Sequence, residues 1–479
     1  MGFCSLSLDS GMTDWCSAHV EGLNRAFDRK NFCSQGFKEI VTLTLYFMHA
    51  SALAAHRFGY AETSLRPLRS DPMAWVLAQF PRDSPSPNVF DSQGLTSSSD
   101  ALRIAKENLR ENRQSLRQID RLGLQRRWQH TISTPAPVAE RWVQFWTNHF
   151  CVSATKARVQ GLVWSHENEA IRPNAQGRFI DLLKASTLHP AMLLYLDNTQ
   201  SIGPDSREGK RRQKGLNENL ARELLELHTL GVNGGYTQND VTETARLLTG
   251  WTTRNATDGQ RNFVAALHQP GTKMILGKRY TQGPQVLDQL LIDLSQHPST
   301  AKHLAIKLAR HFVTDDPPQA LVEVVAARFR DSDGDLRATA CALFEHPLTW
   351  HGNHAPKFKR PDELLLSAHR MLKLPFGNAQ LQAGVQALSS MGQSTGHAPS
   401  PQGWPDRTAD WLSPDALFKR VQWAEGFAAV HADKADARQL AQLAMGEDLG
   451  ESTLRHISQA ESGAQALALW LSSPEFQRR

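Results

Sequence analysis

The stretch LNENLARELLELHTLGVNGGYTQNDVTETARLLTGW, from Leu216 to Trp251, is the most strongly patterned part of this 479-residue chain. Four leucines recur at helical spacing in its first half: Leu216, Leu220, Leu224 and Leu227. This period places them on one face and predicts an amphipathic helix over Leu216–Leu230. Gly231 follows directly and is expected to end that helix.

A second helix is expected after a short turn. Thr237 and Asp240 are spaced as in a capping box with Asp in place of Glu, and Gly250 ends the segment. Helical periods recur over Ala101–Thr131, Pro137–Phe150, Phe179–Asp197, Gln285–Ser295, Ser299–Val313, Pro318–Asp331, Leu336–Phe344, Glu363–Leu372, Leu381–Met391 and Pro414–Ala432. Arg261–Leu267 and Lys273–Leu276 flank a turn and are expected to pair. The prediction is an all-α fold, a multi-helix globular array with a small β-hairpin insertion.

The bulk composition excludes several classes of protein. Apolar residues make up 40% and charged residues 21%, which is typical of a globular chain and not of a disordered one. The net charge is only +5, and the basic residues are spread out, which argues against a nucleic-acid partner. No apolar run reaches the roughly 18 residues of a transmembrane helix. Five cysteines without a CxxC pair argue against a disulfide framework or a zinc finger.

The first 47 residues differ from the rest, because they hold three of the five cysteines and no clear helical period. An apolar run over Ile40–Ala55 fits a late signal peptide, a natural start at Met48, or a buried helix, and the last two are favoured together. Residues 1–47 are therefore expected to be an atypical extension, disordered or not native. Residues 48–479 are expected to form one large helical domain, with a C-terminal subdomain from about residue 355 as an alternative. Without a clear N-terminal signal peptide, cytoplasmic and periplasmic locations both stay open.

Two carboxylates on the first helix are candidates for chemistry. At about 100° per residue, Glu223 and Glu226 share a face with Asn219, whereas His228 points to the opposite side. The two carboxylates could bind a divalent cation or divide into acid and base roles. Glu226 and His228 are two residues apart, so a regular helix cannot offer both to one metal.

Ion pairing is the structural alternative for this face. Glu218 and Arg222 have the favourable i,i+4 order, and Arg222 and Glu226 have the reverse order. His228 is, on the same view, a hydrogen-bonded core histidine, or it faces polar groups of another helix.

The helix expected over Pro137–Phe150 carries a further candidate. Four side chains share one of its faces: Trp142, Phe145, Trp146 and His149. Core packing explains the aromatic rings. Because an aromatic wall would desolvate His149 and shift its pKa, this residue is the candidate for acid–base or metal chemistry.

Motifs along the whole chain resemble those of one family. Besides Leu216–Trp251 they are RFGYA at 57–61, FWTNHF at 145–150, HPAMLLYLDN at 189–198, HPSTAKHLAIKLARHFVTDDPP at 297–318, GWPD at 403–406, WLSPDALFKR at 411–420 and SPEFQ at 473–477. Together they resemble the bacterial, uncharacterised family known as domain of unknown function 1800, over about residues 51–479.

The resemblance implies little about activity, because members of the family are largely uncharacterised. Many are exported and encoded beside a sulfatase-like exported family, which implies a role in the cell envelope with an exported sulfatase-like partner. The signature polar positions correspond to Asn217, Glu218, Asn219, Arg222, Glu223, Glu226, His228, Asp240, Arg246 and Trp251. Members commonly have His-Asp-x-Gly-x-Lys at the hairpin turn. Here the turn reads His268–Gln269–Pro270–Gly271–Thr272–Lys273, and the missing Asp counts against a site role for it.

Several polar side chains lie on helices whose other residues are typical of a protein core. A polar group buried without a hydrogen-bond partner destabilises the fold by about 1–3 kcal/mol, so such a cluster needs an explanation. Two functional hypotheses offer one. The catalytic candidates are Glu223, Glu226, His149, His228 and Asp240, of which Glu223, Glu226 and His149 are also metal candidates. The binding candidates are Asn219, Arg222, Arg246, Trp251 and Asp197. The first hypothesis is an enzyme that performs metal-assisted or general acid–base chemistry in the cell envelope, with a divalent metal as candidate cofactor. The second is a non-catalytic binding or assembly protein whose polar cluster is structural.

Overall fold

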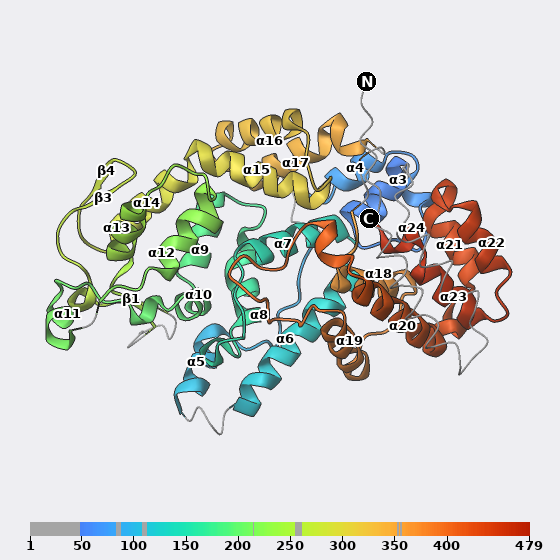
Figure 1. The fold of residues 1–479 in the computed structure, drawn as a ribbon, viewed down its shortest axis with the longest axis horizontal. Coiled ribbons are helices and arrows are strands. Elements are labelled where there is room, and N and C mark those ends of the chain that lie inside the picture. Colours follow the sequence, from blue (N-terminus) through green and yellow to red (C-terminus); the bar gives the residue numbers. More distant parts are fainter. Residues whose placement is uncertain are drawn as a thin grey trace, which may run out of the picture.

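The computed structural model describes residues 48–82, 88–107, 113–213, 215–253, 261–351, 354 and 357–479. The prediction made for residues 1–47 therefore lies outside the described residues. The all-α prediction is confirmed: helices dominate, and only two small two-stranded sheets occur in the part of the chain that the structure describes (Figure 1). None of the described helices has the length and apolar character needed to cross a membrane.

The helices follow one another along the whole described chain. In the first half they are α3 (Ala50–Ala52), α4 (Pro72–Leu77), α5 (Ser98–Glu107), α6 (Arg113–Ser133), α7 (Pro137–His149), α8 (Val163–His166), α9 (Phe179–Thr187), α10 (Pro190–Tyr195), α11 (Arg207–Arg212), α12 (Asn219–Glu223) and α13 (Gln238–Leu248). In the second half they are α14 (Gln285–Ser295), α15 (Pro298–Phe312), α16 (Gln319–Asp331), α17 (Leu336–Glu345), α18 (Pro361–Met371), α19 (Asn378–Ser390), α20 (Pro414–His431), α21 (Ala437–Met445), α22 (Glu451–Ser458), α23 (Gly463–Ser472) and α24 (Pro474–Gln477). Wide π-helical turns form η1 (Leu53–Phe58), η4 (Glu167–Ile171) and η7 (Leu224–Leu230).

Local signals explain where several helices begin. Proline occupies the first turn of α7, where its missing N–H costs nothing. Thr237 and Asp240 form the expected capping box at the start of α13. Gly250 follows that helix with a φ of +94°, as expected for a residue that ends it.

The prediction of one long helix over Ala101–Thr131 is wrong. The structure has α5 and α6 instead, and these two helices pack against each other. Gly123 stays inside α6 because the helix packs closely on α8 there. A Cβ atom at this position would lie 2.6 Å from the Cβ of Trp164.

The predicted hairpin exists with different strand partners. Strand β3 (Lys273–Ile275) pairs with β4 (Lys278–Tyr280), and the turn between them contains Leu276 and Gly277 at positive φ. The upstream strand β2 (Asn262–Phe263) pairs instead with β1 (Trp251–Thr252), directly after α13. The turn around His268 lies before β3 and is not the hairpin turn. The hairpin turn is the tight turn at Leu276 and Gly277, directly after β3.

The helices pack around a core that connects distant parts of the sequence. One cluster of buried apolar side chains includes residues from Met48 to Phe476. Helices α15, α16 and α17 pack on one another in order, and α20 packs on α23. The first described helices lie beside the last ones (Figure 1), where Leu65 N–H donates to Leu443 O at 3.0 Å. The predicted single domain and its alternative boundary near residue 355 stay predictions.

Candidate functional site

The helix carrying the two candidate carboxylates changes its winding part-way along. It begins at Asn219, not at the predicted Leu216, and after Glu223 it continues as the π-helical η7. Thr229 Oγ1 donates to Leu224 O, five residues earlier, at 2.6 Å. Because a π turn holds more residues than an α turn, the regular wheel used to place Glu226 and His228 does not apply beyond Glu223. Such π turns often occur at functional sites.

Glu223 and Glu226 lie in different environments. Both side chains are partly buried. Glu226 accepts a hydrogen bond from the Tyr236 hydroxyl at 2.8 Å. In the described part of the chain, no donor or cation lies within hydrogen-bond or ion-pair distance of the Glu223 carboxylate. Burial raises the pKa of Glu223, the charge of Glu226 raises it further, and Arg222 opposes both effects.

Arg222 does not neutralise the carboxylate pair. Its guanidinium lies 3.3 Å from Glu218, as predicted from their i,i+4 spacing, and donates to Gln238 at 2.9 Å. The predicted pairing with Glu226 is wrong, because the π turn displaces that side chain toward Tyr236. Ion pairing therefore accounts for Glu218 and leaves Glu223 unexplained.

Three histidines lie close to one another, and one of them, His228, belongs to η7 itself. The His149 and His228 ring centres are 6.2 Å apart, and those of His149 and His303 are 6.3 Å apart. His149 Nε2 lies 3.1 Å from His228 O, and His303 Nε2 lies 3.1 Å from Leu227 O. Both ring nitrogens of His228 are buried without a hydrogen-bond partner. The expectation of a hydrogen-bonded core histidine is therefore wrong for His228, although it does face polar groups of other helices.

The pKa values of all three histidines lie below the ordinary value of 6.5. Burial, and next the charge of Lys307, lower the pKa of His228 to about 3 and that of His303 to about 4. The same two causes hold the pKa of His149 well below its ordinary value. This agrees with the prediction that the aromatic face of α7 would desolvate His149.

Several other predicted site residues have structural partners. Asp240 caps α13 and accepts from Leu276 N–H at 2.7 Å, so it fixes the hairpin to that helix. Arg246 pairs with Glu243 on the same helix. Asp197 lies 2.6 Å from Lys156 Nζ.

The remaining two binding candidates also belong to the framework. Asn219 starts α12, where its N–H donates to Asn217 Oδ1 at 3.0 Å. Trp251 lies in β1 and packs edge-on against Phe263 of β2. Within the described ranges, no three His, Cys, Asp or Glu side chains are grouped as a metal site.

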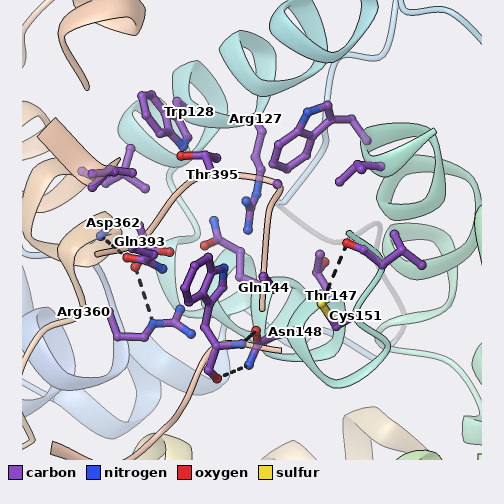
Figure 2. Close-up of a pocket in the computed structure, with 18 residues that line it drawn as sticks. Arg127, Trp128, Gln144, Thr147, Asn148, Cys151, Arg360, Asp362, Gln393 and Thr395 are labelled. Atoms are coloured by element: carbon purple, nitrogen blue, oxygen red, sulfur yellow. Dashed lines mark hydrogen bonds and ion pairs between the residues drawn. The ribbon is translucent and has the colours of Figure 1, made fainter. Parts of the chain in front are cut away.

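A pocket elsewhere in the molecule was not predicted. It has a volume of about 660 Å³, including space open to solvent, and lies between α6, α7, α8, α18 and the loop over residues 392–404 (Figure 2). The motifs FWTNHF and GWPD, noted only as points of family resemblance, contribute Thr147, Asn148 and Trp404 to its lining. Only the fold brings these two motifs together, since 256 residues separate Asn148 from Trp404.

The loop over the pocket is held by reciprocal hydrogen bonds. Asn148 donates to Trp404 O at 2.9 Å and accepts from Trp404 N–H at 2.8 Å. Gly403 has a φ of +82°, and a Cβ atom there would lie 2.6 Å from Asn148 O. A glycine is needed at this position for both reasons. The neighbouring Asp406 is hydrogen-bonded to His311 Nδ1 at 3.0 Å.

The comparison with known families identifies the chain at the level of a family. A family model described as "Protein of unknown function (DUF1800)" matches residues 53–478. The chain belongs to the DUF1800 family. The match includes both the carboxylate helix and the pocket of this DUF1800 protein, and it confirms the resemblance seen in the motifs. No curated protein and no solved structure matches the chain.

Proposed function

We propose that this DUF1800 protein is an enzyme in which Glu223 acts as a general base. The observation that carries the proposal is the unpartnered, partly buried Glu223 carboxylate beside a second carboxylate that has a partner. A carboxylate with a raised pKa accepts a proton more readily at neutral pH than an exposed one. Two carboxylates in unequal environments suit a reaction in which only one of them exchanges a proton.

The neighbouring groups support this division of roles. Tyr236 holds Glu226 in place and leaves Glu223 open to a substrate hydroxyl or to water. The reaction class that fits is hydrolysis or group transfer, in which the base removes a proton from the attacking oxygen. A divalent cation bridging Glu223 and Glu226 is the metal-assisted form of the same proposal.

The family resemblance supports a location for this activity. We propose that the protein acts in the bacterial cell envelope with an exported sulfatase-like protein as partner. Fractionation of the cells that produce it, followed by capture of the native protein from the envelope fraction, tests both statements. Recovery only from the cytoplasm contradicts the first, and capture without a sulfatase-like protein contradicts the second.

The test of the catalytic proposal compares wild type with Glu223→Gln on a panel of chromogenic esters, glycosides, phosphates and sulfate esters. We expect kcat/KM for the substrate found to fall about 10²–10⁴-fold, the usual contribution of a general base. Glu218→Gln is the matched control, because Glu218 lies at the start of the same helix and pairs with Arg222. Elemental analysis of wild type and of the Glu223→Ala, Glu226→Ala double variant tests the metal-assisted form.

A second readout needs no substrate. Titration of the Glu223 carboxyl by ¹³C NMR is expected to give a pKa above its ordinary value of 4.5. A pKa at or below 4.5 overturns the proposal whatever the substrate panel shows. Unchanged activity in Glu223→Gln also overturns it and favours the alternative, a binding or assembly protein whose polar cluster is structural.

A further inference from the structure

The pocket between α6, α7 and the 392–404 loop shares no lining residue with the carboxylate site. Its lining combines polar side chains with three tryptophans: Trp128, Trp164 and Trp404. Among the described residues that line it, Asp362 is the one acid, against the two arginines Arg127 and Arg360. Some of its polar groups already make hydrogen bonds within the protein, and others are free for a ligand.

The amides of Gln144 and Asn148 already make hydrogen bonds within the protein. Gln144 donates to Thr131 and Glu140 and accepts from the Tyr60 hydroxyl at 2.6 Å. Asn148 makes the two hydrogen bonds to Trp404 that hold the loop. Both N–H groups of Gln144 are therefore used, whereas Asn148 keeps one amide N–H that could donate to a ligand.

Arg360 is buried, being only 4% exposed, yet its guanidinium makes no hydrogen bond within the described chain. Its Nε lies 3.5 Å from Asp362 Oδ1 and 3.6 Å from Glu363 Oε1, which are ion-pair distances. The terminal nitrogens face the pocket (Figure 2). The buried Nε has no hydrogen-bond partner, although buried donors normally have one, and the terminal nitrogens reach a space that a ligand can enter.

Arg127 reaches the same space from α6. Its Nε lies 3.1 Å from the buried Glu167 carboxylate, and its guanidinium carbon lies 5.1 Å from the centre of the Trp164 ring. Figure 2 shows Arg127 and Arg360 extending toward the centre of the pocket from different sides. Their terminal nitrogens have no hydrogen-bond partner in the described ranges.

Two smaller groups add further donors. Gln393 accepts from Asp362 N–H at 2.8 Å through its side-chain oxygen, which leaves its NH₂ group free. The Thr395 hydroxyl is buried without a partner. The free N–H groups of the pocket are therefore donors, and two of them carry positive charge. Asp362 is the one opposing charge, and its Oδ1 already accepts from Glu363 N–H at 2.9 Å and lies 3.5 Å from Arg360 Nε. A ligand must supply acceptors and negative charge.

We propose that this pocket binds a small organic anion, with a carboxylate or phosphate group held between Arg127 and Arg360. The planar guanidinium fork matches both oxyanions in a way that an ammonium group cannot. Trp164 and Trp404 offer flat apolar surfaces against which the body of the ligand packs. The Gln393 amide and Thr395 hydroxyl donate to its remaining oxygens. The site belongs to the pocket alone and does not depend on the role of Glu223.

Calorimetric titration with three sugars of similar size tests the proposal. Glucuronate carries a carboxylate, glucose 6-phosphate carries a phosphate, and glucose carries no charge. We expect saturable binding of at least one anion, weakened by added salt, and no binding of glucose. Whichever anion binds more tightly identifies the group that the pocket takes.

The variants Arg127→Lys and Arg360→Lys keep the positive charge but remove the planar guanidinium group that can donate two parallel hydrogen bonds. Each is expected to weaken the affinity for the anion at least about tenfold. Arg126→Lys is the matched control, because Arg126 is the preceding residue of α6, pairs with Asp91 and does not line the pocket. If either lysine variant fails to fold, as judged by circular dichroism, Thr395→Val takes its place, with weaker binding expected.

Three results would overturn the proposal. They are wild-type affinity in both lysine variants, equal binding of glucose and the anions, and no saturable binding of either anion up to about 10 mM, the weak end of specific ligand affinities.

Discussion

Replacing Glu363 with glutamine removes the negative charge at the centre of a buried group of arginines. Glu363 is fully buried in α18, and its carboxylate oxygens lie 2.5 Å from Arg141 Nη1 and 3.0 Å from Arg479 Nε. Burial opposes ionisation of Glu363, but the charges of Arg479, Arg141 and Arg360 outweigh it and hold its pKa well below the ordinary value. The native state therefore depends on this carboxylate being ionised.

The expected loss of stability depends on the hydrogen bonds that each arginine still makes once the Glu363 carboxylate is gone. Arg141 still donates to Gly59 O and Arg479 to His311 O, so neither guanidinium loses all its partners. Removal of one member of a buried ion pair typically costs about 3–5 kcal/mol. Because the glutamine oxygen still accepts one hydrogen bond, we expect a loss of about 3 kcal/mol for Glu363→Gln.

Urea unfolding at pH 7, followed by both circular dichroism and tryptophan fluorescence, measures this loss. Glu345→Gln is the control, because Glu345 is exposed at the end of α17 and a surface change is expected within about 0.5 kcal/mol. The contribution of Glu363 is present above pH 4.5 and is lost as the pH falls toward its folded pKa, so the two proteins should converge in acid. A loss below about 1 kcal/mol at pH 7 would refute the buried-charge argument.

Three further predictions concern the carboxylates, the loop and the histidines. Glu226→Gln removes the neighbouring charge and should lower the pKa of Glu223 toward 4.5 in a ¹³C NMR titration; an unchanged pKa contradicts the assigned coupling. Gly403→Ala should destabilise the protein to urea by more than the roughly 1 kcal/mol expected for Gly392→Ala. Both glycines have positive φ, but only a Cβ at Gly403 meets another atom closely, so equal losses would contradict the predicted clash. The pKa of His228 lies at about 3 when folded and 6.5 in its ordinary state, so protons bind the unfolded chain preferentially between these values. The free energy of unfolding should therefore fall from pH 6.5 toward pH 4, and less steeply in His228→Leu; equal slopes would count against a neutral, buried His228.

Local patterns predicted the helical elements well where the physical cause is local. The first-turn proline of α7, the Thr237–Asp240 capping box and the glycine after α13 act within a few residues of their own position. The wide turn of η7 is different. The same leucines can be buried by an α turn or by a π turn, but the two turns place different side chains beside one another on the helix surface. Packing, and not the sequence period, decides which of the two turns forms.

The candidate site divides in the same way. The sequence determined that Glu223, Glu226 and His149 lie on helices with buried faces, because the helical period acts through residues three or four apart. It could not determine that Tyr236 binds Glu226, that His228 faces His149, or that Arg222 turns to Glu218 and Gln238. Those outcomes depend on side chains that compete for partners once the helices pack.

The pocket shows the limit most clearly. The all-α class, the family and most of the helices could be predicted from the sequence, because they depend on local periods and motifs. The folded chain alone brings Arg127 and Arg360, which lie far apart in the sequence, into one pocket that Trp404 also lines. A charge in a sequence does not reveal whether it will be paired, since pairing depends on which oxygen atoms the folded chain places within about 3 Å of it.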